Sequence, residues 1–381
     1  MNNLHISLTS FKNESRLLKE AKSLLKNSFV SNVFVAALHE EGLKEDERLE
    51  SNLRVTRFKL STRKWGANLI VRLLKYFEFC MRVYFHHRTL NIKSVNVHSL
   101  GLLPLGYFLK LSFGAKLIYD AHELETESNG LAGFRQRLAK FIERNLIKRV
   151  DGVIVVSESI ADWYQGTYDI TRPAVVMNVP WYRTISKSDK FRDELGIKKQ
   201  QKIFLYQGLL SPGRGIELII DTFKTENSNN VVVFMGYGVL EETIKSAAGQ
   251  HSNIFFFPAV SPEVVLNYTA SADVGISIIE NVCLSYYYCM PNKMFEYAMA
   301  GIPTIVSNMK EMSHFVNTYK AGAVIEENKV EYLRKAITDI SSLSKDELKE
   351  NCYNVATQFS WETQEKIMLD AYTQWGFRGN I

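Results

Sequence analysis

Short apolar runs alternate with helical patterns along nearly the whole chain, and this alternation constrains the fold more than any other feature. In the first half the runs are "LHISLTS", "NVFVAALH", "SVNVHS", "AKLIYD" and "DGVIVVS". In the second half they are "KIFLYQG", "NVVVFMG", "NIFFFPA", "ADVGISII", "PTIVSN" and "AGAVIEE". Strands that alternate with helices form parallel sheets covered on both faces. The sequence therefore predicts an α/β protein with doubly wound, Rossmann-like sheets.

The alternation is interrupted around residues 178–200, a polar and charged stretch that contains Pro180. A chain of 381 residues is also long for a single hydrophobic core. We therefore predict an N-terminal domain over residues 1–182 and a C-terminal domain over 183–360, facing each other across a cleft. A last helix, at about 361–381, is predicted to pack back on the N-terminal domain. Ligands of such sheets bind where strands end and helices begin.

Composition and charge argue against several classes of protein. Hydrophobic residues make up 46% and charged residues 23%, which is typical of a globular chain and not of a disordered one. The net charge of +5 is too small to indicate a nucleic acid partner. The four cysteines form no CxxC pair and no histidines have metal-binding spacing, so we predict reduced thiols and no metal. No signal peptide and no uncharged apolar run of about 18 residues is visible, which indicates a cytoplasmic protein.

A glycine-rich segment, "GLLSPGRG", follows the strand "IFLYQ" in the second half. Its spacing from Gly208 to Arg214 imitates a nucleoside-triphosphatase loop, but arginine replaces the lysine and Gly215 replaces the magnesium-binding hydroxyl residue. Triphosphate hydrolysis is therefore disfavoured. Gly236 offers further bare backbone after the next strand. Together these residues indicate a diphosphate-binding loop, and a tight turn with a solvated arginine is the alternative.

The segment "PNKMFEYAMAGIPTIVSN" predicts a helix that has Asn292 as a plausible cap and ends at Gly301. A lysine in the first turn is unfavourable at a positive helix N-terminus unless an anion lies there. Asn292, Lys293 and Glu296 can share one side of the first turns. Lys293 then suits a phosphate oxygen, and the Glu296 carboxylate suits ribose hydroxyls. The alternative is an ordinary surface pair between the two side chains.

In the first half, "YDAHELE" places Asp120, His122, Glu123 and Glu125 directly after a strand. Acidic groups beside a histidine can orient its tautomer and raise its pKa. We take His122, Asp120 and Glu123 as candidate catalytic residues, and a capped turn with surface charges is the alternative. The loop "SFKNESR" after the first strand has no glycine fingerprint, which argues against a dinucleotide oxidoreductase.

Together these segments resemble the retaining glycosyltransferases of the GT-B fold, often called family four. The residues that carry the resemblance are "YDAHELE", "YQGLLSPGRGIELI", "FMGYG", "ASADVGISI" and "PNKMFEYAMAGIPTIVSN", in this order. The resemblance spans most of the chain. It implies a hexosyltransferase-type enzyme whose second domain binds a nucleoside-diphosphate sugar and whose first domain binds the acceptor.

The resemblance also implies individual roles. Arg214 matches the family's phosphate-binding lysine, and Glu296 matches the second glutamate of its E-x7-E motif, which is expected to bind ribose. Gly208 stands where the backbone approaches the donor, and His122 resembles the histidine beside the reacting sugar. Such enzymes are thought to retain anomeric configuration without a protein nucleophile. The implied acceptor-binding residues in the first domain are Phe11, Asn13 and Arg16.

Two positions depart from the family pattern. Leu209 stands where arginine is usual, and Tyr288 stands where the first glutamate of E-x7-E is expected. No Asp-x-Asp pair is present, so we expect no metal to hold the diphosphate. Its charge is then balanced by Arg214, Lys293 and helix N-termini.

Two first-domain segments, residues 62–88 and 134–149, are basic and apolar at once. A basic amphipathic helix can lie on an anionic membrane, whereas a helix with one face in the core is the alternative. We predict a metal-independent, retaining glycosyltransferase that transfers sugar to a glycan or lipid-linked acceptor in surface polysaccharide biosynthesis, at the inner face of the cell membrane. The alternatives are a sugar-nucleotide epimerase or hydrolase on the same scaffold, and a non-catalytic sugar-nucleotide-binding protein.

Overall fold

The structure is a computed structural model that describes residues 1–12, 14–66, 68–225 and 229–378. The chain divides into two compact units. Unit 1 contains Met1–Val176 together with the C-terminal segment from Glu365, and unit 2 contains Met177–Gln364. The sequence predicted the boundary after position 182. In the structure the chain enters unit 2 at Met177, a few residues earlier.

Unit 1 is built on an eight-stranded sheet with the order β3-β4-β2-β1-β5-β6-β7-β8. Neighbouring strands run parallel except β3 and β4, which pair antiparallel. The elements are β1 (Asn2–Ile6), α1 (Ser15–Lys26), β2 (Asn32–Leu38), β3 (Asp46–Glu50), β4 (Leu53–Phe58), α2 (Leu69–His87), β5 (Ile92–Val97), α3 (Leu103–Phe113), β6 (Lys116–Ala121), α4 (Gly133–Leu146), β7 (Gly152–Val155), α5 (Glu158–Tyr168) and β8 (Ala174–Val175). Short 3-10 turns lie at Ser61–Lys64, Leu100–Leu102, Glu125–Glu127 and Ile147–Arg149.

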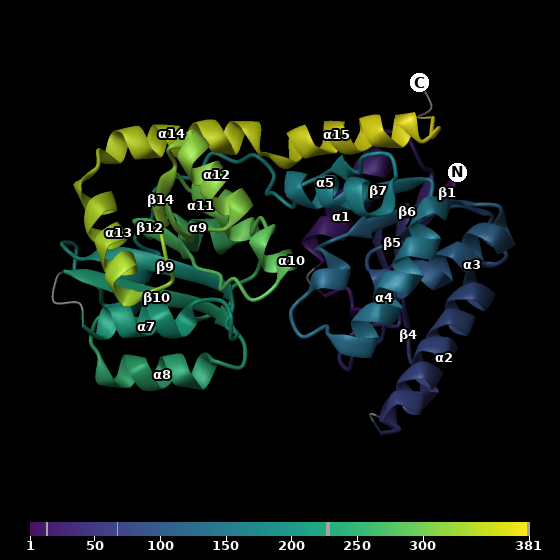
Figure 1. The fold of residues 1–381 in the computed structure, drawn as a ribbon, viewed down its shortest axis with the longest axis horizontal. Coiled ribbons are helices and arrows are strands. Elements are labelled where there is room, and N and C mark those ends of the chain that lie inside the picture. The colour runs from purple at the N-terminus through teal and green to yellow at the C-terminus, as the bar shows by residue number, and fades with distance from the viewer. Residues whose placement is uncertain (13, 67, 226–228, 379–381) are drawn as a thin grey trace. The chain divides into compact units, whose positions relative to one another are not determined.

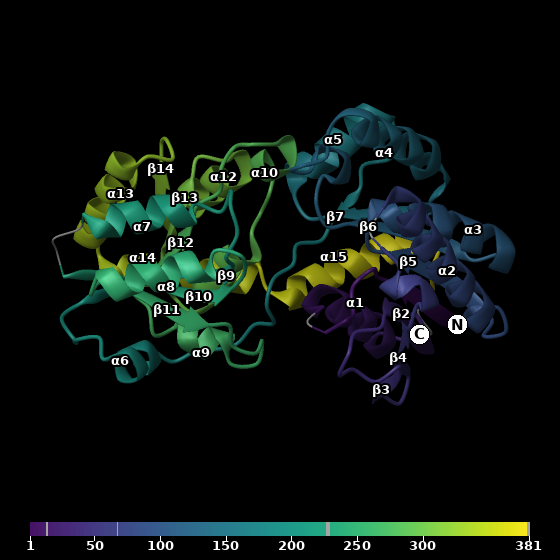
Figure 2. The ribbon, with the colours of Figure 1, turned by 90° about the horizontal axis from the view of Figure 1, so that it is seen from below.

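Helices cover both faces of this sheet. On one face, α3 packs so closely that a Cβ on Gly106 would lie 2.7 Å from side-chain atoms of Val97 and Leu117. On the other face, α1 lies beside the C-terminal helix α15 (Trp361–Gln374), as Figure 2 shows. Asn27, which follows α1, donates a hydrogen bond to Glu365 of α15. The last helix of the chain therefore contributes to the core of unit 1.

The sheet face below α1 and α15 carries a buried polar stripe. Asn3, Ser94 and Asn96 are fully buried, and the Asn3 amide donates to Ser94 Oγ at 2.7 Å and to Asn96 Oδ1 at 2.9 Å. Asn96 in turn donates to the Tyr372 hydroxyl of α15. Because side chains alternate between the faces of a strand, Val95 and Val97 point to the opposite, apolar face. This stripe ends at the carboxyl edge of the sheet.

Unit 2 is built on a six-stranded, parallel sheet with the order β11-β10-β9-β12-β13-β14. The elements are α6 (Lys190–Leu195), β9 (Lys202–Leu209), α7 (Ile216–Lys224), β10 (Asn230–Tyr237), α8 (Glu241–Gln250), β11 (Ile254–Pro258), α9 (Val265–Thr269), β12 (Val274–Ser277), α10 (Leu284–Tyr287), α11 (Asn292–Met299), β13 (Thr304–Ser307), α12 (Lys310–Tyr319), β14 (Gly322–Ile325), α13 (Val330–Ser342) and α14 (Lys345–Gln358).

Both faces of the unit 2 sheet are apolar. Phe204 and Tyr206 of β9 pack in one core with α7, α8 and α13, and Ile203 and Leu205 pack in another with α6, α9 and α11. Figure 1 shows α7 and α8 on one side of the sheet and α9 and α11 on the other. Continuous apolar strands of this kind are typical of sheets buried on both faces. The predicted α/β class with two doubly wound, Rossmann-like domains is confirmed.

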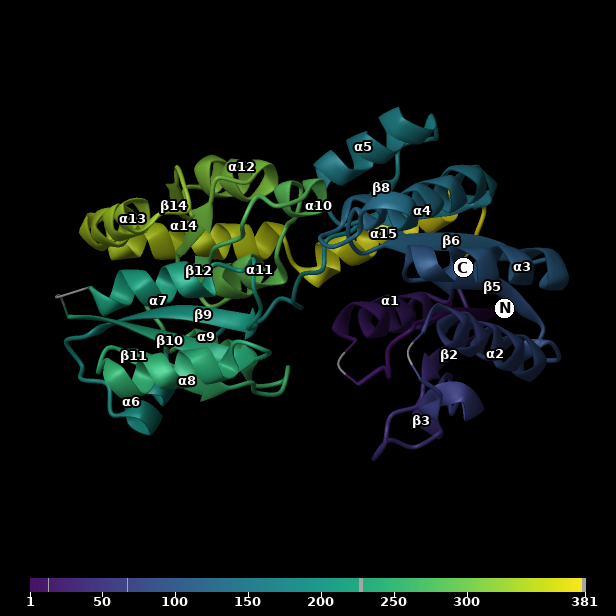
Figure 3. The ribbon, with the colours of Figure 1, turned by 60° about the horizontal axis from the view of Figure 1, so that its bottom comes forward.

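In unit 2 the strand order reverses at β9, whose neighbours are β10 and β12. Loops at such a reversal diverge and leave room for a ligand at the carboxyl ends of the strands. Figure 3 shows α11 near the carboxyl end of β9. Among the described residues, every helix is too short or too polar to cross a bilayer.

Candidate active site

The carboxyl end of β9 brings bare backbone next to a cation. Gly208 has a φ of +117°, a conformation that side chains strongly disfavour. A Cβ placed there would lie 3.8 Å from Nζ of Lys293 in α11. The predicted donor-binding residues Gly208 and Lys293, far apart in the sequence, therefore lie side by side.

Gly236 has a clear packing role. It is the register partner of Gly208 in the β9–β10 pair, and a Cβ on Gly236 would lie 1.9 Å from the Gly208 carbonyl oxygen. Any side chain at 236 would therefore displace the Gly208 backbone. The sequence predicted that Gly236 contacts the donor. In the structure, its missing side chain leaves room for the Gly208 backbone at the end of β9.

Arg214 and Lys293 place two positive charges in this region. The Lys293 ammonium lies 3.6 Å from the centroid of the Tyr206 ring, and the Arg214 guanidinium lies 4.7 Å from that of Tyr286. Burial and the charge of Arg214 lower the pKa of Lys293 to about 7. Within the described residues, the buried Nε of Arg214 has no hydrogen-bond partner. Two like charges held together in a partly dry site favour an anionic ligand.

Glu296 is oriented by a residue that the sequence analysis missed. The buried Gln207 donates from Nε2 to Glu296 Oε2, and the Thr269 hydroxyl donates to Gln207 Oε1 at 2.8 Å. A chain of hydrogen bonds thus fixes the amide and, through it, the carboxylate. One signal was present: Gln207 is the polar residue that ends the otherwise apolar run "IFLYQ".

The remaining predicted residues of unit 2 are placed differently. Asn292 is exposed and is the first residue of α11, and Pro291 occupies the N-cap with φ −67° and ψ 133°. The cap assigned to Asn292 is therefore wrong, because the proline already holds the extended conformation that precedes a helix. Leu209 is about half exposed, and the Tyr288 ring lies 5.3 Å from the Lys310 ammonium.

In unit 1, Asp120 at the end of β6 is held by a buried arginine. Arg16 of α1 donates from Nε to Oδ2 at 3.0 Å and from Nη2 to Oδ1 at 2.6 Å, and its Nη1 donates to the Val176 carbonyl at 2.7 Å. The side chains of Arg16 and Asp120 are 4% and 0% exposed. Burial opposes ionisation of Asp120, yet the charge of Arg16 and the hydrogen bonds from His122 and His98 hold its pKa well below the usual range.

Two histidines also donate to Asp120. Oδ2 accepts from His98 Nδ1 at 2.9 Å and from His122 Nε2 at 2.8 Å. Because His98 uses its Nδ1 proton on Asp120, its Nε2 accepts from His5 Nδ1 at 2.8 Å. Burial lowers the pKa of both His5 and His98, so they are neutral. The sequence predicted no histidine cluster here, because His5 lies in β1 while His98 and His122 follow β5 and β6, and these strands meet only in the sheet.

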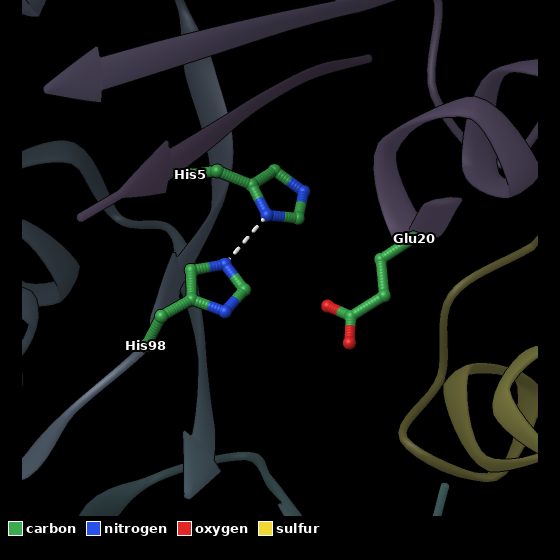
Figure 4. Close-up of side chains that lie close together, drawn as sticks. All are labelled: His5, Glu20 and His98. Carbon is green, nitrogen blue, oxygen red and sulfur yellow. Dashed lines mark hydrogen bonds between the residues drawn. The ribbon is translucent and has the colours of Figure 1, made fainter. Parts of the chain in front are cut away.

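Glu20 of α1 lies against this group, as Figure 4 shows together with His5 and His98. It is fully buried, and in the described part of the chain neither carboxyl oxygen accepts a hydrogen bond, although Arg16 Nε lies 3.0 Å from Oε1. Burial and the neighbouring Asp120 raise the pKa of Glu20 well above its usual value. Glu20 is therefore neutral, and the charges of Arg16 and Asp120 offset each other.

Two sets of these side chains have the proximity that metal ligands need. Ligand atoms of His5, Glu20 and His98 lie within 4.8 Å of one another, and so do those of His98, Asp120 and His122. However, both nitrogens of His98 are engaged in hydrogen bonds, and Arg16 already supplies the counter-charge for Asp120. A divalent ion would add uncompensated charge to a buried, balanced group. The donor set therefore suits protons better than a cation.

The structure brings together only some of the predicted acceptor-binding and catalytic residues of unit 1. His122 and Asp120 lie together, and Glu123 is exposed. Phe11 is buried with a φ of +54°, and Arg57 donates to its carbonyl at 3.4 Å. Asn13 lies outside the described residues.

Arg16 was predicted to bind the acceptor, and the structure places it elsewhere. Its guanidinium is buried, and it is engaged by Asp120 and the Val176 carbonyl. Its burial does not support the predicted acceptor contact, and Nε, Nη1 and Nη2 each donate a hydrogen bond inside the domain.

Two families match the sequence. Residues 187–359 match glycosyl transferases group 1, and residues 30–178 match Glycosyltransferase Family 4. None of the curated proteins compared with the chain matches it.

Similar solved structures cover almost the whole chain. Sucrose-phosphate synthase from Thermosynechococcus elongatus superposes with a TM-score of 0.80 at 14% identity, covering 98% of each chain. HepE from Anabaena, in complex with UDP and glucose, has a TM-score of 0.73 at 13% identity and covers 98% of this chain and 100% of its own. WaaG, a glycosyltransferase involved in lipopolysaccharide biosynthesis, has a TM-score of 0.70 at 15% identity and covers 99% of this chain and 100% of its own.

The family matches and the fold agree. One match covers most of unit 2, the other covers most of unit 1, and the similar structures extend over both. The chain therefore belongs to the glycosyltransferases of the GT-B fold, family four, with a C-terminal domain of the glycosyl transferases group 1.

Proposed function

We propose that the protein is a retaining, metal-independent glycosyltransferase whose unit 2 binds a nucleoside-diphosphate sugar. In the reaction, the bond between the anomeric carbon and the diphosphate oxygen breaks, and a bond from that carbon to an acceptor hydroxyl oxygen forms. The hydroxyl proton passes to the departing diphosphate. No protein nucleophile takes part, so the chain acts by positioning the reactants and stabilising charge.

One observation carries this proposal: Lys293 places a positive charge beside the bare backbone of Gly208, and Arg214 adds a like charge close enough to act on Lys293. Without a ligand they repel each other, and the pKa of Lys293 is lowered to about 7. A diphosphate bound there offsets both charges and accepts the unpartnered Arg214 N–H. The charge that develops on the leaving diphosphate is stabilised by the same groups, which removes the need for a metal ion.

Glu296 is proposed to bind the ribose of the nucleoside, because a carboxylate only accepts hydrogen bonds and therefore suits paired ribose hydroxyls. Gln207 holds this carboxylate in a defined orientation. The structures of HepE contain UDP and UDP-glucose, which supports a uridine diphosphate sugar as the donor class.

The acceptor is proposed to be a glycan or a lipid-linked sugar at the inner face of the cell membrane, in surface polysaccharide biosynthesis. The helices α2 and α4 support a membrane location because each exposes large apolar side chains beside cations. The exposed apolar residues include Leu69, Ile70, Leu73, Phe77, Phe134, Leu138 and Phe141. Exposed cations on the same helices include Arg72, Arg135, Arg137 and Arg144. An anionic bilayer complements this surface, with about 1 kcal/mol for each cation near it.

Calorimetric titration with UDP, with uridine and with inorganic phosphate tests the donor site. We expect UDP to bind far more tightly than uridine, in buffer with or without EDTA. Strong inhibition of UDP binding by EDTA would contradict metal independence. Equal affinity for UDP and uridine would contradict the role of Arg214 and Lys293 in binding the diphosphate. Incubation with UDP-glucose alone separates a transferase from a hydrolase or epimerase, which would consume the donor without an acceptor.

Sedimentation with vesicles tests the membrane surface. We expect the chain to bind vesicles of phosphatidylglycerol and not of phosphatidylcholine, and to lose this binding in the double variant Phe134→Ser/Phe141→Ser. Val239→Ser, which changes an exposed apolar side chain of unit 2, is the matched control. Equal binding by both variants would contradict the assignment.

A further inference from the structure

Donors from three separate elements converge on one carboxylate in unit 1. Asp120 accepts hydrogen bonds from Arg16 of α1, from His98 beyond β5, and from His122 beyond β6. Arg16, His98 and Asp120 are buried, whereas the His122 side chain is 32% exposed. The three buried side chains are therefore inaccessible to a substrate. Among these four residues, only His122 can contact a ligand.

The contacts determine which nitrogen of His122 carries the proton. An ionised carboxylate only accepts hydrogen bonds, so Nε2 of His122, which faces Asp120 at 2.8 Å, carries a ring proton. His98 Nδ1 lies 3.3 Å from the same Nε2, but both nitrogens direct their protons to Asp120 Oδ2. In a ring with a single proton, Nδ1 of His122 is then left with its lone pair. Within the described residues it makes no recorded hydrogen bond.

We propose that Arg16 is a positioning residue of the transfer reaction: by holding Asp120, it keeps His122 in the Nε2–H tautomer with Nδ1 as an outward hydrogen-bond acceptor for a sugar hydroxyl. The transfer reaction and the identity of the hydroxyl-bearing ligand rest on the proposed function. The tautomer and its dependence on Arg16 follow from unit 1 alone.

The shape of arginine explains why this residue occupies the position. Nε and Nη2 of its planar guanidinium donate to both oxygens of Asp120, and Nη1 donates to the Val176 carbonyl. The carboxylate can therefore neither rotate nor shift. Glu20 is fully buried, and its Oε1 lies 3.0 Å from Arg16 Nε. A lysine would keep the charge but lose the two-point contact.

The tautomer can be measured directly in the full-length chain. Long-range proton–nitrogen correlation spectra of protein labelled with ¹⁵N-histidine distinguish protonated from bare ring nitrogens, and His122→Asn identifies the signals of His122. We expect the wild-type ring to show a single tautomer with bare Nδ1. In Arg16→Met the signals should shift to a mixture of tautomers. A wild-type ring with bare Nε2, or an unchanged single tautomer in Arg16→Met, would overturn the proposal.

Two further variants separate positioning from folding. Arg172→Met removes another arginine, which pairs with Glu158 and Asp162 on the surface of unit 1, and should leave the His122 signals unchanged. Arg16→Lys keeps the buried charge, and a folded chain is expected with a partial loss of the single tautomer. If Arg16→Met fails to fold, the Arg16→Lys spectrum decides, and an unchanged single tautomer there refutes the proposal.

UDP affinity distinguishes this proposal from the proposed donor site. Because Arg16 lies in unit 1, UDP should bind Arg16→Lys within about twofold of wild type, which is less than 0.5 kcal/mol. Failure of the wild type to bind UDP would refute the donor site and leave the tautomer result standing. A tenfold loss of UDP affinity in Arg16→Lys would show that Arg16 acts on the whole fold, and would overturn a positioning role.

Discussion

The two units each carry a cluster of charged side chains at the carboxyl edge of a sheet, and the clusters differ in charge balance. In unit 1 the charge of Arg16 is matched by Asp120, and Glu20 is neutral. In unit 2 the like charges of Arg214 and Lys293 lie near each other, and the nearby carboxylate of Glu296 is bound to Gln207.

This difference indicates what each cluster does. Opposite charges that are buried and fully hydrogen-bonded are complete without a ligand, so they hold neighbouring groups in place. Like charges beside bare backbone gain most of their stabilisation when an anion arrives. We therefore interpret the unit 1 cluster as scaffolding for His122 and the unit 2 cluster as a binding site for diphosphate.

The largest expected effect tests the charge balance of unit 1. Asp120→Asn should lower the free energy of unfolding by about 3–5 kcal/mol, because it leaves Arg16 buried without its counter-charge. Glu20→Gln should cost less than about 1 kcal/mol, because the raised pKa of Glu20 makes it neutral, like glutamine, at pH 7. Urea denaturation of both variants measures the difference. Similar losses in the two variants would show that Glu20 is ionised.

The next effect concerns the unbalanced cluster of unit 2. Arg214→Met should weaken UDP binding by roughly 10- to 100-fold, since a hydrogen bond to a charged group contributes about 1.5–3 kcal/mol. Uridine affinity should remain within about twofold of wild type, because uridine lacks the diphosphate. Calorimetry gives both values. Parallel losses for UDP and uridine would place Arg214 outside the phosphate site.

The lowered pKa of Lys293 makes UDP binding depend on pH. With a pKa of about 7, half of the Lys293 side chains are charged at pH 7 and roughly one tenth at pH 8. Bound diphosphate favours the charged form and raises this pKa, so binding at pH 8 takes up nearly one proton. UDP affinity should fall roughly fivefold from pH 7 to pH 8.

Calorimetry in two buffers of different ionisation enthalpy measures the proton uptake. Lys293→Met should bind UDP more weakly and without uptake at either pH. If the wild type also binds without proton uptake at pH 8, Lys293 does not contact the diphosphate.

The smallest expected effect concerns the orientation of Glu296. Gln207→Leu should weaken both UDP and uridine by about threefold, equivalent to roughly 0.7 kcal/mol, because the carboxylate loses its donor but keeps its position on α11. In Glu296→Gln the further change Gln207→Leu should then have little effect, since the pair acts as one unit. Additive losses in the double variant would show that Gln207 acts independently of Glu296.

Much of the fold was predictable because its signals are local. The apolar run of β9 predicts a strand, and Gly208 and Gly236 mark the ends of two strands. Neither prediction needs knowledge of the spatial neighbours. Lys293 stood out because a cation at a helix N-terminus is unfavourable, which is a property of a few consecutive residues. The same local logic misassigned the cap at Asn292, where Pro291 already shaped the turn.

What escaped prediction depends on pairs of residues brought together by the sheet. Arg16 and Asp120 are 104 positions apart, and Gln207 and Glu296 are 89 apart. Nothing in the local pattern around Arg16 reveals that it is buried, because its hydrogen-bond partners are Asp120 of β6 and the Val176 carbonyl, which follows β8. The sequence therefore predicted an acceptor contact and gave no sign of its contacts with Asp120 and the Val176 carbonyl.

The sequence alone determined the alternation of strands and helices, the glycine-rich strand ends and the positive charge at the start of α11, because each depends on neighbours along the chain. Only the tertiary structure decided that the charge of Arg16 is matched by buried Asp120 and that the like charges of Arg214 and Lys293 lie near each other. The physical reason is that burial and charge compensation depend on distances of a few ångströms between residues that are far apart in the chain.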